Sequence, residues 1–413
     1  LSLGVSGDGG LPLRLGMRDG NTSDSVETPV AIEECLALGL QGGHGIVADS
    51  KAYSRRTLGL CREKGLGLVT LVPRTCAVRQ DLEAWGAPQP ALPLLVEKPG
   101  RTKDEACRQW HGQSVIRPVE VEYSDGRVTQ EDLRFLVVHS SQLAQQHTQT
   151  YASAQEKEAE ALTDHVQRVH ARWLACAADA EAAIAEYEHQ EPGRRGRRPH
   201  PWRYHAVRYR VVADTRRMRR ARRGRPAKTD PPSLEAGYRL GVDVEALANP
   251  EEANGWMVLA TTVHAEVCGD TDILQAYQDQ NTTVEPGFRW IKNPAAIAPV
   301  WLEKPERIAA LAMLTVVGLL VYCLIQRQVR LYLHTHNQQI PGNKGLTATP
   351  TAAVVLALFA QVALIQLVIG DQEVGQIYGV QPHHLMFCDA LGLDHSWYMV
   401  PSAQKSARGI QTP

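Results

Sequence analysis

The chain has 413 residues and a formal net charge of -1, with 44% hydrophobic and 22% charged residues. This length allows two or three domains with buried cores. The near-zero net charge excludes a bulk electrostatic attraction to nucleic acid. The eight cysteines include no Cys-x-x-Cys pair, so neither a disulfide framework nor a zinc ribbon is expected. The cysteine pattern fits a reducing cytoplasm. No basic stretch followed by an apolar core opens the chain, so no signal peptide is expected.

Residues 1–74 alternate between predicted strands and helices. Strands at 1–6 and 11–18 are joined by the glycine-rich turn at 7–10, which is typical of a hairpin. Asp24 is predicted to cap a helix that runs to Leu38, with Glu27 as its capping-box partner.

A short apolar strand at 45–48 ends on Asp49, and a helix through Arg62 and a strand at 67–72 follow. In open α/β sheets, functional groups collect at the carboxyl ends of strands, which makes Asp49 a candidate site residue. An aspartate in this position can also be only the N-cap of the next helix. Both interpretations of Asp49 remain open.

The α/β alternation stops between Arg74 and about Asn249, which indicates an inserted domain. Residues 119–123 and 133–139, on either side of a Ser-Asp-Gly turn, predict β structure, and one long helix is predicted over 141–189.

A basic segment follows this helix. Residues 192–228 contain fifteen Lys or Arg and one acid, Asp214. A strand at 202–212 interleaves these charges with Trp202, Tyr204 and Tyr209, which would suit phosphate contacts combined with ring stacking. Residues 223–226, Arg-Gly-Arg-Pro, resemble the core of an AT-hook, which lays arginines along a narrow minor groove. A solvated basic linker is the alternative.

A strand at 256–262 precedes a polar helix that carries Tyr277 and Glu285. Glu285 lies seven residues before Lys292, and seven residues are two helical turns, so one continuous helix would point both side chains to one side. A carboxylate and an ammonium there could serve a metal and a phosphate, although an amphipathic surface helix has the same pattern. Pro286 lacks an N–H, so the helix is predicted to start or kink there.

Two apolar runs follow, at 308–325 and 352–369. Their lengths permit membrane spans, but buried core helices have the same composition and are the favoured interpretation. A membrane protein remains an alternative. His383, His384 and Cys388 lack the spacing of a known metal site and are interpreted as ordinary fold or surface residues. The tail at 401–413 is expected to be disordered.

Residues 20–24, 47–54, 72–74, 277–292 and 304–307 together resemble the DDE transposases of bacterial insertion sequences, in the insertion-sequence-four superfamily. The resemblance implies an α/β fold: a ribonuclease-H-like mixed sheet with flanking helices, interrupted by a large mixed β and helical insertion, with the N-terminal part of the core missing. It divides the chain into a first part of the core (1–74), an insertion that contacts DNA (75–250), a second part of the core (251–400) and the tail.

Such enzymes use two divalent metal ions, Mg²⁺ or Mn²⁺, to cleave terminal inverted repeats and to transfer the ends into target double-stranded DNA. The resemblance implies a homodimer on DNA at the nucleoid, in the bacterial cytoplasm. It makes Asp49 and Glu285 catalytic, metal-binding acids, and it makes Tyr277 and Lys292 members of a Tyr-Arg-Glu-Lys signature. The residues expected to contact DNA are Tyr277, Lys292, Arg289, Arg194, Arg195, Arg197, Arg198, Arg223 and Arg225.

Three departures from the family pattern favour a truncated or degenerate copy. No residue matches the first catalytic aspartate, and Gln280 replaces the signature arginine. Glu285 comes eight residues after Tyr277 instead of seven, which turns the pair about 80° apart on an ideal helix. A non-catalytic DNA-binding remnant that acts through the arginine-rich insert is therefore the alternative function.

Overall fold

The computed structural model describes residues 2–18, 24–86, 92–100, 106–188, 202–217, 234–249, 255–291, 304–343, 345–369 and 372–396. The chain forms two compact units. Unit 1 comprises Leu1–Pro73, Ile116–Arg134 and Ala260–Pro413, and unit 2 comprises Arg74–Val115 and Phe135–Leu259. The predicted tail lies outside the described residues.

The protein is a mixed α/β structure with a curled six-stranded sheet in the order β3-β4-β10-β7-β6-β5. The strands are β3 (Gly45–Ala48), β4 (Gly67–Leu71), β5 (Leu94–Lys98), β6 (Arg108–Glu122), β7 (Val128–Ser140) and β10 (Trp256–Thr261). The strands predicted at 45–48, 67–72 and 256–262 are thus confirmed to within one residue. The predicted strands at 119–123 and 133–139 are also confirmed, as parts of the longer β6 and β7.

Strands β3 and β4 are parallel, with Ala48 opposite Thr70. They are connected by the 3-10 helix η1 (Ser50–Ala52) and by α2 (Arg55–Glu63). Ser54 caps α2, since its side chain accepts the N–H of Thr57. A Cβ on Gly59 would lie 1.9 Å from the carbonyl oxygen of Glu122, so glycine is what allows α2 to approach β6 this closely.

The first hairpin forms a sheet of its own and does not join the six strands. Strand β1 (Ser2–Val5) pairs antiparallel with β2 (Pro12–Gly16), as predicted, and α1 (Asp24–Ala37) packs against both. Gly39, with a φ of 106°, follows the end of α1, and the N–H of Leu40 bonds to the carbonyl of Cys35, which closes the helix.

The predicted capping role of Glu27 is wrong. Its side chain, 11% exposed, accepts hydrogen bonds from Ser2, from Arg14 at 2.7 Å and from Arg18 at 2.8 Å. The guanidinium of Arg14 is buried, and it also pairs with Glu34. Two buried charges are tolerated only when they pair with each other. The Glu27 carboxylate therefore bonds to Arg14 instead of to the helix terminus.

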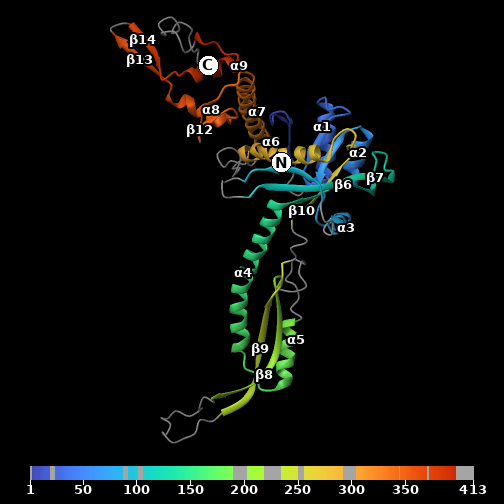
Figure 1. Ribbon diagram of the computed structural model, residues 1–413. Helices are drawn as coiled ribbons and strands as arrows, with labels where there is room; N and C mark the ends of the chain where they lie inside the picture. Colours follow the sequence, from blue (N-terminus) through green and yellow to red (C-terminus); the bar gives the residue numbers. More distant parts are fainter. Residues whose placement is uncertain are drawn as a thin grey trace. The chain divides into compact units, whose positions relative to one another are not determined.

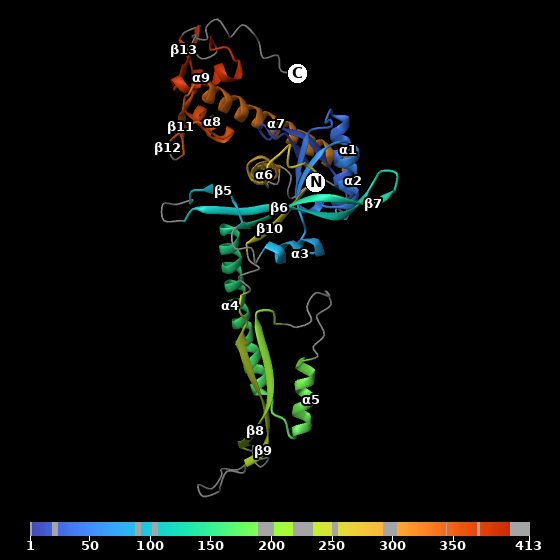
Figure 2. The ribbon, with the colours of Figure 1, turned by 45° about the vertical axis from the view of Figure 1, so that its right-hand side comes forward.

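The rest of unit 1 is mainly helical. It contains α6 (Asp270–Ile291), α7 (Pro305–Thr335), α8 (Ala352–Leu358), η3 (Phe359–Gln361) and α9 (Pro382–Leu391), with two small hairpins, β11 (Ile340–Gly342) with β12 (Gly345–Thr347) and β13 (Ala363–Ile369) with β14 (Gln372–Tyr378). In Figure 2, α8 and α9 gather at the C-terminal end of α7. His384, buried in α9, accepts the N–H of Gln381 and bonds to the carbonyl of Leu358, so it joins α9 to α8.

The second apolar helix was predicted wrongly. Only residues 352–358 form an α-helix, and residues 363–369 form strand β13. Ile365, Val368 and Ile369 lie within this strand, and branched side chains favour extended backbone. The pairing of Ala363–Ile369 with Gln372–Tyr378 supplies the partner that a strand needs.

The first apolar run does form a helix, but the expectation that it is buried is wrong. Only 22% of the most apolar 18-residue window of α7 is buried, and by length and composition this helix is able to cross a membrane. One side packs against the β1–β2 hairpin and α6 through Leu319, Cys323 and their neighbours. The described residues leave much of the other side exposed, because they supply packing partners on one face only.

Unit 2 contains the remaining elements: α3 (Ala77–Gly86), α4 (Ser141–Ala171), α5 (Ala177–Glu188), β8 (His205–Arg217) and β9 (Leu234–Ala246). The β8–β9 hairpin lies between α4 and α5 (Figure 1). The single helix predicted over 141–189 is wrong, because the chain is extended at Arg172 and Leu174 bridges to Tyr238 of β9. Burial of Leu174 against the hairpin outweighs the local helix propensity.

The Arg14–Glu27 pair provides a test of the hairpin's anchoring. Replacing Arg14 with Met leaves the buried Glu27 carboxylate without its main partner, and we expect a loss of about 3 kcal/mol in the free energy of unfolding. The control is Arg18→Met, because the Arg18 side chain is 40% exposed and should contribute less than about 1 kcal/mol. Urea denaturation of both variants measures the difference, and equal losses would contradict the assignment.

Candidate functional site

Asp49 occupies the carboxyl end of β3. Its carboxylate accepts the N–H of Lys51 at 3.0 Å and so caps η1, while the hydroxyl of Thr70 donates to its backbone oxygen at 2.5 Å. The side chain is exposed. The capping role considered from the sequence is therefore real, but it concerns η1 and not the longer helix α2. It uses one carboxylate oxygen and leaves the other available.

Helix α6 passes the same end of the sheet. The amide of Gln280 donates to the carbonyl oxygen of Ala48 at 3.5 Å, across 232 residues of sequence. At the start of the helix, the buried Arg134 pairs with Asp270 at 2.5 Å and donates to the carbonyl of Cys268 at 2.8 Å. Acids in the first turn, Asp270 and Asp272, also suit the positive end of the helix dipole.

The last turns of α6 pack against the β1–β2 hairpin. A Cβ on Gly287 would lie 3.1 Å from Leu3, and Ile291 is buried together with Leu319. Pro286 lies inside this helix, so the helix does not start at the proline, and the kink that was the other expectation stays a prediction. The proline ring removes one backbone hydrogen bond, and burial of Gly287 and Ile291 offsets that loss.

Glu285 is directed away from the end of β3. It follows Gln280 by five residues, which corresponds to a rotation of about 140° around the helix, and its side chain is exposed. Val284, the residue seven after Tyr277, is only about 40° from Gln280. The side of α6 that faces β3 therefore presents an amide and an apolar side chain, and among the described residues no contact joins Glu285 to Asp49.

The other signature residues are spread around the helix. Tyr277 is half-buried and lies about 60° from Gln280, whereas the exposed Arg289 lies about 180° from it. Lys292 is outside the described residues. The structure thus brings Asp49 close to the Gln280 side of α6 and does not gather the predicted set at one point.

The donor set does not fit a pair of divalent metals. Magnesium and manganese sites need several oxygen ligands, largely carboxylates, and across the part of the chain that the structure describes, no group of three or more His, Cys, Asp or Glu could hold a metal ion. Near Asp49, the neutral amide of Gln280 bonds to the carbonyl oxygen of Ala48. We therefore derive no catalytic step through a metal.

The six insert arginines predicted to contact DNA, Arg194, Arg195, Arg197, Arg198, Arg223 and Arg225, lie outside the described residues. The described part of the basic segment is the β8–β9 hairpin. Its two strands carry five arginines and four acids. Three of these arginines have an acid within the hairpin: Arg210 with Asp243, Arg216 with Glu235, and Arg239 with Asp214. The hairpin itself is nearly neutral.

The aromatic residues of this segment serve the core of unit 2. Tyr209 stacks on Tyr187 at 5.4 Å and bonds to His165 at 2.9 Å, and Trp202 packs on the same histidine. Tyr204 meets Tyr151 edge to face at 4.9 Å. The expectation that these rings are available to stack on bases is therefore wrong, because a hairpin between two helices needs apolar side chains for its own core.

Sequence reasoning missed the residue that anchors this hairpin, Glu158 on α4. Its carboxylate, 10% exposed, accepts the backbone N–H groups of Arg203 and Tyr204 at 2.9 and 2.7 Å and contacts His205 at 3.2 Å. Burial alone would raise the pKa of Glu158, but these hydrogen bonds outweigh it, so the pKa lies below its ordinary value of 4.5. Glu158 is one of many acids on α4, and no sequence signal distinguishes it.

No protein-family model matches this chain, and no curated protein matches it.

The cap at Asp49 can be separated from any chemical role. Asp49→Ala should lower the free energy of unfolding by about 1 kcal/mol through loss of the cap, whereas Asp49→Asn should retain it to within a few tenths. Urea denaturation measures both variants. Equal losses in the two variants would show that the charge, and not the cap, stabilises this loop.

The contacts of Glu158 predict that acid destabilises the β8–β9 hairpin. Because its pKa is lowered in the fold, its contribution to stability is present above the ordinary value of 4.5 and is lost as the pH falls through the lowered pKa. Glu158→Gln should cost about 2 kcal/mol at neutral pH and should reduce this acid dependence. The control, Glu156→Gln, changes an exposed acid on the same helix. Identical pH profiles for the wild type and Glu158→Gln would refute the anchoring role.

Proposed function

We propose that this chain is a DNA-binding protein of the DDE-transposase type, with a ribonuclease-H-like core in unit 1. The observation that supports this proposal is the meeting of α6 with the end of β3, where Gln280 reaches Ala48 beside Asp49. The parallel pair β3 and β4, linked by a helix, and the sequence resemblance at residues 47–54 and 277–292 support the same family. Unit 2 corresponds in this proposal to the DNA-contacting insertion.

The geometry favours DNA binding over DNA cleavage. A complete enzyme of this type would cleave inverted repeats and transfer the ends with two Mg²⁺ or Mn²⁺ ions, held by acids that include Asp49 and Glu285. Here Glu285 is exposed and lies about 140° around α6 from Gln280, the residue that reaches the end of β3. We therefore propose a degenerate copy that recognises DNA without cleaving it.

The proposed contacts with DNA are electrostatic. Residues 192–228 carry fifteen positive side chains against one acid, and such a density of like charge is stabilised by an anionic partner. The nearly neutral β8–β9 hairpin would act as the scaffold for the arginine-rich segments, one of which precedes β8 in the sequence while the other connects β8 to β9. The partners in this proposal are inverted repeats and target double-stranded DNA, bound by a homodimer at the bacterial nucleoid, with Tyr277, Arg289 and Lys292 as further contacts.

Salt dependence tests the electrostatic contacts. We expect the affinity of the full chain for duplex DNA to fall steeply with salt, measured by fluorescence anisotropy of a labelled duplex. Replacing Arg194, Arg195, Arg197 and Arg198 with Gln should reduce the slope of log affinity against log salt by about 3 to 4, because each phosphate contact contributes about 0.9.

The matched control removes arginines that already have an acid within the hairpin. Arg210→Gln with Arg216→Gln changes the charge of the same region, and the slope should change by less than about 0.3 per substitution, well below the 0.9 of a phosphate contact. Equal effects per arginine in the two sets would mean that overall charge, and not a specific segment, binds DNA.

Incubation with Mg²⁺ or Mn²⁺ tests the catalytic part of the proposal. The wild-type chain should leave supercoiled and linear duplex DNA uncut. Metal-dependent cleavage that Asp49→Ala abolishes would contradict this proposal and would support an intact transposase instead.

A further inference from the structure

One face of α7 exposes a continuous row of large apolar side chains, which we call the α7 stripe. Its members are Met313, Leu314, Val317, Val321, Leu324 and Leu331, between 37% and 70% exposed. Most are three or four residues apart, so they lie on one side of the helix. The stripe covers nineteen residues, from Met313 to Leu331, or about 27 Å. The opposite side of α7 is the one that packs against the β1–β2 hairpin and α6.

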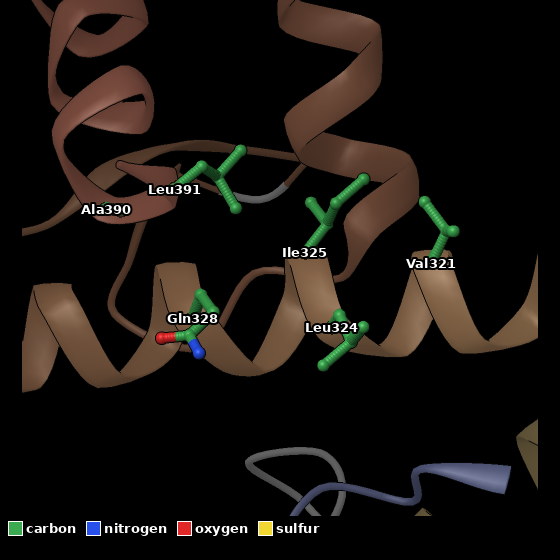
Figure 3. A pocket seen from close by; sticks show the side chains of 6 residues that line it. All are labelled: Val321, Leu324, Ile325, Gln328, Ala390 and Leu391. Carbon is green, nitrogen blue, oxygen red and sulfur yellow. The ribbon is translucent and has the colours of Figure 1, made fainter. Parts of the chain in front are cut away.

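Beside the stripe, α7 and α9 enclose a hollow of about 450 Å³. Figure 3 shows the side chains that line it, with Leu391 of α9 facing Ile325 of α7. Val321 and Leu324 belong to both the stripe and the lining. Met313 and Leu314, the two most exposed residues of the stripe at 68% and 70%, precede Leu324 by about ten residues, or about 15 Å along the helix.

The same helix therefore carries both a protrusion and a recess. In an antiparallel pair of α7 helices with a two-fold axis beside residues 318–320, Leu314 of each copy would lie opposite Leu324 of the other, and Val317 would lie opposite Val321. Each protruding pair, Met313 with Leu314, then enters the hollow of the second copy. A two-fold interface requires this kind of self-complementarity, since one patch must fit itself.

The packing of α7 also distinguishes a protein partner from a lipid bilayer. Arg327 pairs with Asp8 at 2.7 Å, and the hairpin that covers the other side of α7 contains Arg14, which pairs with Glu27 of α1. A bilayer around α7 would have to enclose these groups at high cost. Contiguous apolar patches larger than a few hundred Å² are rare on monomers, and a row of six large exposed apolar side chains suits the centre of an interface that buries about 800 Å² on each partner.

We propose that the α7 stripe and the hollow between α7 and α9 form a two-fold interface through which two copies of this chain associate. This inference rests on the homodimer of the proposed function and names its interface. DNA binding is measured separately through its salt dependence, so failure of the interface and failure of DNA binding are distinguishable.

Sedimentation velocity of the full chain in buffer without detergent tests this interface. The wild type is expected to be a dimer that dissociates on dilution. Leu314→Glu should weaken the dimer by at least tenfold, because it places a carboxylate in an apolar hollow. The matched control is Leu346→Glu, since Leu346 on β12 is also 70% exposed but lies outside the stripe, and it should leave the dimer unchanged. Both side chains are exposed, so thermal unfolding of the variants should match that of the wild type.

A paired substitution tests the two-fold register. Leu314→Lys and Leu324→Glu should each weaken the dimer alone, whereas the double variant should recover at least part of the affinity, because each lysine then faces a glutamate of the other copy. The two positions are about 15 Å apart within one chain, so they cannot pair internally.

Three results would overturn the proposal. They are a monomeric wild type at every concentration, a dimer that Leu314→Glu leaves intact, and a chain that sediments with phosphatidylcholine vesicles instead of forming a dimer. A double variant no tighter than the single variants would reject the antiparallel register proposed here.

Discussion

The placement of α6 across the carboxyl end of β3 is the constraint on which the candidate site depends. Arg134 holds the first turn through Asp270, Gln280 meets Ala48 in the middle, and Gly287 packs on Leu3 near the end. Three contacts along a stiff helix fix both its rotation and its axial position. A change of one residue in the spacing between Tyr277 and Glu285 therefore cannot be absorbed locally. It places Val284, and not Glu285, on the side of α6 that carries Gln280.

Much of the secondary structure could be predicted because local signals and burial agree. The strands at 45–48, 67–72 and 256–262 are short apolar runs next to glycine or polar residues, and they appear almost as expected. The wrong predictions concern segments whose structure depends on partners that are distant in the sequence. The helix-forming sequence is interrupted at Leu174, which bridges to Tyr238. Residues 363–369 form a strand because they pair with β14. The Glu27 carboxylate pairs with Arg14 instead of capping the helix. None of these partners is visible in the local pattern.

The site was predictable in position but not in detail. Asp49 follows β3 as the strand pattern indicated, and its capping bond to Lys51 shows that the structural and chemical interpretations of one aspartate do not exclude each other. For the basic segment, by contrast, the composition did not predict how the side chains are used. Composition counts charges and rings, but it does not show that Asp243, Glu235 and Asp214 pair with the hairpin arginines, or that Trp202 and Tyr209 pack on His165. Pairing across the hairpin decides which charges remain for a partner.

Helix α7 shows why apolar composition alone does not decide the environment of a helix. A core helix, a membrane span and an interface helix have the same run of Leu, Val and Ala, because each removes that run from water. The difference lies in what covers the remaining sides. Here one side packs on the β1–β2 hairpin. Arg14 of this hairpin pairs with Glu27 of α1, and Asp8 of its turn pairs with Arg327, so the helix is already fixed to a charged structure. The uncovered stripe then needs a partner that is apolar only over one narrow face, and a second α7 is apolar over such a face.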